Sequence, residues 1–94
     1  MPHLLIHHKV RDFGKWKPFF DRHQNFRKIS GAINTQLFQN VEDPNDVFVL
    51  AEWDSDEHAR DFASSEDLKK TMEKAGVFGN PHILLLKKIQ EYKT

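Results

Sequence analysis

The sequence predicts one α+β domain whose strands and helices follow the order β-α-β-β-α-β. Three observations support this prediction. Along His3–Val10, a period of two places mostly apolar residues on one face and mostly polar residues on the other, as in a strand. Large residues between Phe13 and Arg27 recur at spacings of three and four, which draws one stripe on a helix. A short turn, Glu42–Asp46, separates two apolar segments, which should therefore pair as an antiparallel hairpin.

The first strand and the first helix are expected at His3–Val10 and from Phe13 onward. Asp12 is the expected helix N-cap, and Gly31 the expected stop. Pro18 has no amide hydrogen to donate, so the helix should be irregular or bent there. One strand face should carry Leu4, Ile6, His8 and Val10.

The second half of the chain is expected to hold the hairpin, a second helix and a last strand. The hairpin strands are Ala32–Val41 and Val47–Trp53. Asp54 is the expected cap of the second helix, with Glu57 three residues later as in a capping box. Ser64 and Ser65 should break or restart this helix, Gly76 should end it, and the last strand should run over Pro81–Tyr92. These elements give the ferredoxin-like layout: an antiparallel sheet with both helices on one face.

Both faces of the predicted sheet are apolar, which leaves one face uncovered. Val47, Val49 and Ala51 point to one side of "VFVLAEW", while Phe48 and Leu50 point to the other. The expected cover is a second copy of the sheet, so the sequence predicts a homodimer joined sheet to sheet. If Leu85 faces the partner, Leu85→Asp should disrupt the assembly. The alternative is a monomer with an exposed apolar patch.

Length and composition restrict the class of protein. The 94 residues form a single domain, 1–94, and the absence of cysteine excludes disulfides and cysteine-based zinc sites. A formal net charge of zero argues against a nucleic-acid partner. The longest apolar run, Ile83–Leu86, is too short to span a membrane, and the N-terminal segment lacks a signal-peptide pattern. We therefore expect a cytoplasmic protein.

The stripe on the first helix suggests a pocket as well as a core. His23 and Arg27 continue the stripe that Phe13, Trp16 and Phe20 begin. A buried guanidinium is costly unless it is paired or hydrated, so this end of the helix should border a polar cleft. His8 should face the same space from the first strand. Aromatic walls with a few convergent polar groups are typical of small-molecule sites.

Each of these residues has an expected role in that pocket. His23 or His8 could take a proton from a phenol or an activated carbon acid, and Arg27 could stabilise the resulting phenolate or enolate. The side chains expected to contact a flat substrate are Trp16, Phe20, Phe38 and Trp53.

A structural interpretation competes with this one. Arg27 could extend to the helix end and pair with an acid, leaving His23 as a core or rim histidine and the space filled by aromatic rings. No metal is expected, because His7 and His8 point to opposite strand faces and no carboxylate-rich cluster is present. On the face expected to meet the partner, His7 could make the interface sensitive to pH.

Three segments resemble a known group of proteins. They are "HKVRDFGKWKPFFDRH" (His8–His23), "DPNDVFVLAEWDSDEHARDFASSEDL" (Asp43–Leu68) and "AGVFGNP" (Ala75–Pro81). Together they resemble small bacterial proteins of the dimeric α+β barrel superfamily, above all the antibiotic-biosynthesis-monooxygenase type and related sequences labelled "cyclase". The resemblance implies a ferredoxin-like subunit that forms a dimeric α+β barrel.

The chemistry implied by the resemblance is broad. The superfamily includes cofactor-free oxygenases acting on phenolic polyketides, polyketide cyclases, haem-degrading enzymes and isomerases. The cofactor-free oxygenases often line their pocket with tryptophan, asparagine and arginine, and Trp16, Arg27 and Trp53 could fill similar roles. No haem-ligating histidine motif is assignable. The expected function is binding a planar aromatic or polyketide-like compound, and oxidising or cyclising it without a cofactor. The alternative is a non-catalytic ligand-binding or structural homodimer.

Overall fold

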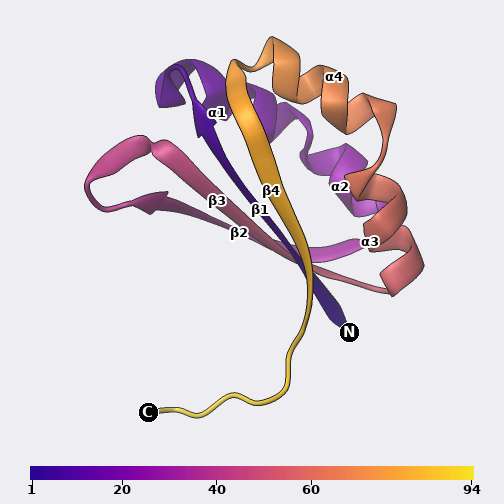
Figure 1. Ribbon diagram of the computed structural model, residues 1–94. Helices are drawn as coiled ribbons and strands as arrows, with labels where there is room; N and C mark the ends of the chain where they lie inside the picture. Colours follow the sequence, from indigo (N-terminus) through magenta and orange to yellow (C-terminus); the bar gives the residue numbers. More distant parts are fainter.

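The computed structural model describes residues 1–94 as a four-stranded antiparallel sheet with four helices on one face (Figure 1). The strands are β1 (Pro2–Val10), β2 (Ala32–Asn40), β3 (Asp43–Trp53) and β4 (Val77–Lys87). The helices are α1 (Phe13–Arg22), α2 (Gln24–Ser30), α3 (Asp56–Ala63) and α4 (Glu66–Lys74). The strand order β2-β3-β1-β4 is that of the ferredoxin-like fold. The predicted fold class is confirmed, with each predicted helix built from two shorter ones.

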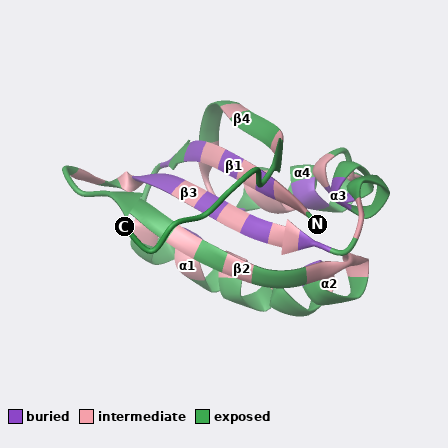
Figure 2. Ribbon diagram, turned by 90° about the horizontal axis from the view of Figure 1, so that it is seen from below, coloured by how far each residue is buried: buried purple, intermediate pink, exposed green.

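The core lies between the helices and the face of the sheet predicted to be buried. Figure 2 shows the alternation of buried and less buried residues along β1 and β3. In β1 the buried residues are Leu4, Ile6, His8 and Val10. Ile6 pairs with Val49 and Leu4 with Ala51, so the central strands present one apolar face to the helices. Trp16, Phe62 and Leu68 complete the core from the helix layer.

The first predicted helix divides at His23. Asp12 caps α1 as predicted, because its side chain accepts a hydrogen bond from the Lys15 amide. Pro18 lies inside α1. His23 is both the C-cap of α1 and the N-cap of α2. Gly31 ends α2 with a φ of 121°, a conformation that favours glycine. The helical segment therefore ends at Gly31 as predicted, but it is divided into two helices at His23.

The second predicted helix begins one residue later than expected. Ser55, not Asp54, is the cap, since the Ser55 hydroxyl accepts from the His58 amide at 3.1 Å. The Asp54 carboxylate instead bonds the His58 ring at 2.7 Å. The predicted interruption at the serine pair is confirmed, because Ser64 ends α3 and Ser65 caps α4.

The hairpin turn and the last strand differ from their predicted positions. β3 already begins at Asp43, so most of the predicted turn lies within the strand. β4 runs over Val77–Lys87 rather than Pro81–Tyr92. Its partner β1 begins at Pro2, which pairs with Lys87, so no strand remains to pair with residues 88–92. The chain beyond Lys87 leaves the sheet (Figure 1).

The sheet face away from the helices, called the open face below, is uncovered and apolar. Its large apolar residues are Leu5, Phe38, Phe48, Leu50, Leu84 and Leu86. Leu84 is 51% exposed and Leu86 is 40% exposed. Leu85 pairs with Leu4 and packs against the core, so it does not lie on the open face. The sequence-based choice of Leu85 as an interface residue is therefore wrong. No helix combines the length and apolar character needed to cross a membrane.

Candidate functional site

A partly open cavity of about 50 Å³ lies between the helices and the sheet. Six of the seven predicted site residues line it: His8, Trp16, Phe20, His23, Arg27 and Trp53. The remaining lining residues are Leu4, Ile6, Phe19, Val49, Ala51, Phe62, Leu68, Thr71, Met72 and Ala75. The cavity thus has an aromatic and aliphatic wall with a few polar groups, and no carboxylate lines it.

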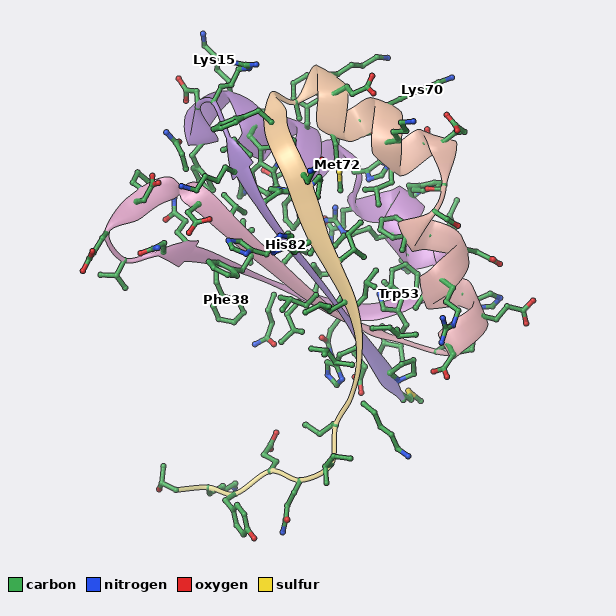
Figure 3. The ribbon with its side chains drawn as sticks, viewed as in Figure 1. Lys15, Phe38, Trp53, Lys70, Met72 and His82 are labelled. Carbon is green, nitrogen blue, oxygen red and sulfur yellow. The ribbon has the colours of Figure 1, made fainter.

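Phe38 is not part of this cavity, contrary to the sequence-based prediction. In β2, Leu37 pairs with Val49 of the core face, and the next residue, Phe38, pairs with Phe48 of the open face. Figure 3 shows Phe38 pointing away from the helices, on the opposite side of the sheet from Trp53. Phe38 is 48% exposed and cannot contact a ligand held between the helices and the sheet.

All the buried side-chain polar atoms that lack a hydrogen-bond partner belong to residues lining the cavity. These atoms are both ring nitrogens of His8, Nε2 of His23, Nε of Arg27 and Nε1 of Trp53. An unsatisfied buried donor or acceptor costs roughly 1–3 kcal/mol, and such groups are rare in folded proteins. Their convergence on one cavity indicates a site that water or a ligand satisfies.

Arg27 is a buried cation without a carboxylate partner. It is 7% exposed, and its Nη1 donates to the backbone carbonyl of Phe20 at 2.9 Å. Its guanidinium carbon lies 4.0 Å from the centre of the Phe20 ring. No ion pair to an acid forms, so the expected alternative of a surface-paired Arg27 is not found. Burial lowers the pKa of Arg27, but a guanidinium remains protonated in proteins.

His8 is held as a neutral imidazole. It is 6% exposed and meets the Trp16 ring edge-on, with 5.6 Å between ring centres. Burial, with a smaller contribution from nearby His7, lowers the pKa of His8 from 6.5 to about 4. At neutral pH its ring therefore offers one donor and one acceptor to the cavity.

His23 occupies the junction between α1 and α2. Its ring stacks on Phe26, with 4.8 Å between ring centres, and lies 6.1 Å from the Phe62 ring. Burial and the positive charge of Arg27 lower the pKa of His23, while Asp67 opposes the change. A neutral His23 can accept a proton inside the cavity at physiological pH.

The opposite wall of the cavity comes from α4, which the sequence analysis did not assign to the site. Leu68, Met72 and Ala75 line the cavity, and their helical spacing is that of any buried helix face. Thr71 gave no signal in the sequence, because a single threonine beside lysines is typical of a helix surface. In the structure, no three histidine, cysteine or acidic side chains converge as they would around a metal ion.

Solved structures of other proteins share the fold of this chain. SnoaB of Streptomyces nogalater, a cofactor-independent oxygenase, is 13% identical, with a TM-score of 0.80 over 99% of this chain and 97% of SnoaB. Rv0793 of Mycobacterium tuberculosis is 9% identical, with a TM-score of 0.70 over 97% of this chain and 98% of that protein. At these identities the likeness shows a shared fold.

The sequence matches cover a smaller part of the chain than the structural matches do. A Haloquadratum walsbyi protein named "putative heme-binding protein" is 37% identical over 46 residues, which are 49% of this chain and 9% of that protein. This chain therefore spans about a tenth of its length. The model of the family described as antibiotic biosynthesis monooxygenase matches residues 17–74, more than half of the chain. The chain belongs to the antibiotic biosynthesis monooxygenase family.

Proposed function

We propose that the protein binds a small planar aromatic or polyketide-like compound in the cavity and oxidises or cyclises it without a bound cofactor. The observation that carries this proposal is the convergence of the unpartnered buried polar atoms on one aromatic-walled cavity. A core built only for stability would not collect these atoms in one place, since each one costs free energy. The family membership and the oxygenase among the structural relatives support the same chemistry.

In this proposal His23 is the general base. The pKa of His8 is about 4, so His8 is a weak proton acceptor at neutral pH. His23 lies beside Arg27, whose charge would stabilise the anion that proton removal creates. His8 and the Trp53 indole N–H would bind oxygen atoms of the substrate, and Trp16 would stack on its ring.

The proposed reactions need no redox group from the protein. Proton transfer from an activated CH₂ group of the substrate to His23 gives an enolate. Addition of O₂ to that carbon and loss of water convert CH₂ to a carbonyl, with one oxygen atom in the product and the other in water. In a cyclisation, the same enolate carbon would instead attack a carbonyl carbon of the same molecule, and the alkoxide formed there would take the proton back from His23, with no oxidant consumed.

Haem is the second ligand to consider, because of the name of the Haloquadratum relative. His8 and His23 both have unengaged ring nitrogens, the neutral form that binds metals. The cavity of about 50 Å³ is smaller than a polycyclic aromatic compound or a porphyrin, so either ligand would have to displace side chains, and the larger porphyrin would have to displace more of them. We therefore derive no step through haem.

We further propose that the protein is a homodimer joined through the open face. Six large apolar side chains lie there without cover. Contiguous apolar patches on soluble proteins commonly mark interaction sites, and a flat sheet is complementary to a second copy of itself about a twofold axis. Of the chain's own elements, all four helices lie on the other side of the sheet (Figure 1).

Replacing Arg27 tests the binding site directly. In a thermal-shift screen, one class of hydroxylated polycyclic aromatics or quinones should stabilise the wild type. Arg27→Met keeps the length of the side chain but removes the charged donor, so it should weaken binding by about tenfold or more. His23→Ala should abolish turnover of the same compounds, measured as oxygen uptake or cyclised product.

Arg22→Met is the matched control for Arg27. Arg22 lies at the end of α1, where its guanidinium stacks over the Phe19 ring. Phe19 lines the cavity, but Arg22 does not. Arg22→Met should bind the compounds as the wild type does. If no compound stabilises the wild type, the proposed binding function is wrong. If compounds bind but are not converted, the protein is a non-catalytic ligand-binding homodimer.

A further inference from the structure

We propose that the ring of Phe20 is a plug that occupies the ligand's own position, a slot between Trp16 and Arg27 that takes a planar aromatic anion. This inference rests on the proposed function, which it makes more specific. It identifies where the ligand lies, which side chain it displaces, and what charge it carries.

The geometry around Phe20 is that of a bound aromatic ligand. Its ring stacks on the Trp16 indole, with 5.1 Å between centres and 24° between planes. The guanidinium carbon of Arg27 lies 4.0 Å from the centre of the Phe20 ring. Phe20 is thus held between an aromatic ring and a cation, both of which attract flat aromatic groups.

The volumes on either side of Phe20 show why the plug has to move. The cavity of about 50 Å³ is smaller than the cavity of about 150 Å³ that admits benzene in an engineered protein. A second hollow of about 360 Å³, called the outer groove, lies against α1, α2 and β2. Phe20 and Arg27 are the residues that line both spaces. Displacement of the Phe20 ring would therefore join the cavity to the outer groove and open a path for a ligand.

The backbone near Phe20 favours such a displacement. Pro18 lies two residues before it and cannot donate the helical hydrogen bond to the Gly14 carbonyl. The helix ends at Arg22, two residues after Phe20. Arg27 is bonded to the Phe20 backbone carbonyl, not to the ring, so the guanidinium can stay in place when the ring rotates.

The charge of the slot selects the class of ligand. Arg27 is the one formally charged residue that lines the cavity. The nearby Asp21 carboxylate raises the pKa of Arg27 but forms no ion pair with it. The Nε of Arg27 has no hydrogen-bond partner. A ligand that brings a carboxylate, phenolate or enolate would satisfy this donor and compensate the buried charge. The slot therefore fits a planar aromatic anion better than a neutral molecule of the same shape.

Three naphthalene compounds of different charge can test both parts of the inference. They are 2-naphthoate (anion), 2-naphthalenemethanol (neutral) and 2-naphthylmethylammonium (cation), each titrated calorimetrically into the intact protein. Phe20→Ala should bind 2-naphthoate about tenfold more tightly than the wild type, because no ring has to be displaced. It should prefer 2-naphthoate to the alcohol, with the ammonium compound weakest. The double variant Phe20→Ala/Arg27→Met should lose the preference for the anion.

Phe13→Ala is the matched control for Phe20. The Phe13 ring also lies against Trp16, at 5.6 Å between centres, but it does not line the cavity. Phe13→Ala should therefore bind 2-naphthoate as the wild type does. Thermal melting followed by circular dichroism checks that each variant is folded. If Phe20→Ala is unfolded, Phe20→Leu, with its smaller side chain, replaces it and should also bind more tightly than the wild type.

The possible failures are distinguishable. If the wild type binds a planar compound and the folded Phe20 variant binds it no more tightly, Phe20 does not block the ligand's position and the proposed function stands. If the Phe20 variant binds the anion and the alcohol equally well, the assigned charge class is wrong. If neither protein binds any planar aromatic compound, the inference and the proposed function both fail.

Discussion

Acidification from roughly pH 7.5 to pH 4 should lower the unfolding free energy of the wild type by about 3 kcal/mol more than that of a His8→Leu variant. The pKa of His8 is about 4 in the folded protein, against 6.5 for an ordinary histidine. Above 6.5 the imidazole is neutral in both the folded and the unfolded state, and stability is unaffected. Between 6.5 and 4 the unfolded chain binds a proton that the folded protein does not, so stability falls as the pH falls.

Urea denaturation at several pH values measures this effect. Leucine is apolar and of comparable bulk, so His8→Leu should fold while removing the titrating group. His58 is a control for the sign of the pH dependence of stability. Its bond to Asp54 raises the pKa of His58, so it stabilises the folded protein at low pH and loses that effect as the pH rises. Replacing His58 should therefore make the unfolding free energy fall further on acidification. Parallel pH profiles for the wild type and His8→Leu would contradict the assignment of His8 as a buried neutral imidazole.

Leu84→Asp should convert a dimer to a monomer at low micromolar concentration. Leu84 is 51% exposed on the open face, and a carboxylate there would have to be buried opposite its own copy in a sheet-to-sheet dimer. Native mass spectrometry of the wild type and the variant measures the change. We expect wild-type dimer and variant monomer, with the folded subunit retained because Leu84 does not contribute to the core.

Ile29→Asp is the matched control for this substitution. Ile29 is 73% exposed on α2, on the helix side of the sheet, so a carboxylate there should leave the dimer intact. A wild type that is a clean monomer would refute the sheet-to-sheet assembly. Dimers that persist in Leu84→Asp with normal stability would place the interface elsewhere.

The strands could be predicted from the sequence because each residue's side is fixed by a period of two. His8 follows Leu4 and Ile6 on the buried face, and the structure finds it there, 6% exposed. The same rule explains the error at Phe38. Which face of β2 meets the helices depends on its pairing with β3, where Leu37 lies beside Val49. That register comes from contacts between strands and is not visible within either strand alone.

The helix stripe predicted that the side chains of His23 and Arg27 lie on the cavity side, although it did not predict the break at His23. Periodicity shows which residues share a helix face, and this face continues across the junction because α2 begins immediately after α1. The contribution of α4 depends on how two distant helices pack, so Thr71 could not be assigned. The end of β4 at Lys87 likewise depends on where its partner strand begins. These features arise from tertiary contacts, and no local pattern encodes them.

The unpartnered polar atoms of the cavity are proposed to bind a ligand, and the indole N–H of Trp53 reports on such binding directly. Trp53 is fully buried, and its Nε1 has no partner in the protein. In a ¹H–¹⁵N spectrum, with the two tryptophan signals assigned by a Trp53→Phe variant, we would titrate a compound selected by the thermal-shift screen. We expect a saturable downfield shift of the Trp53 N–H as it donates to the ligand. Binding that leaves this resonance unmoved would contradict this proposal.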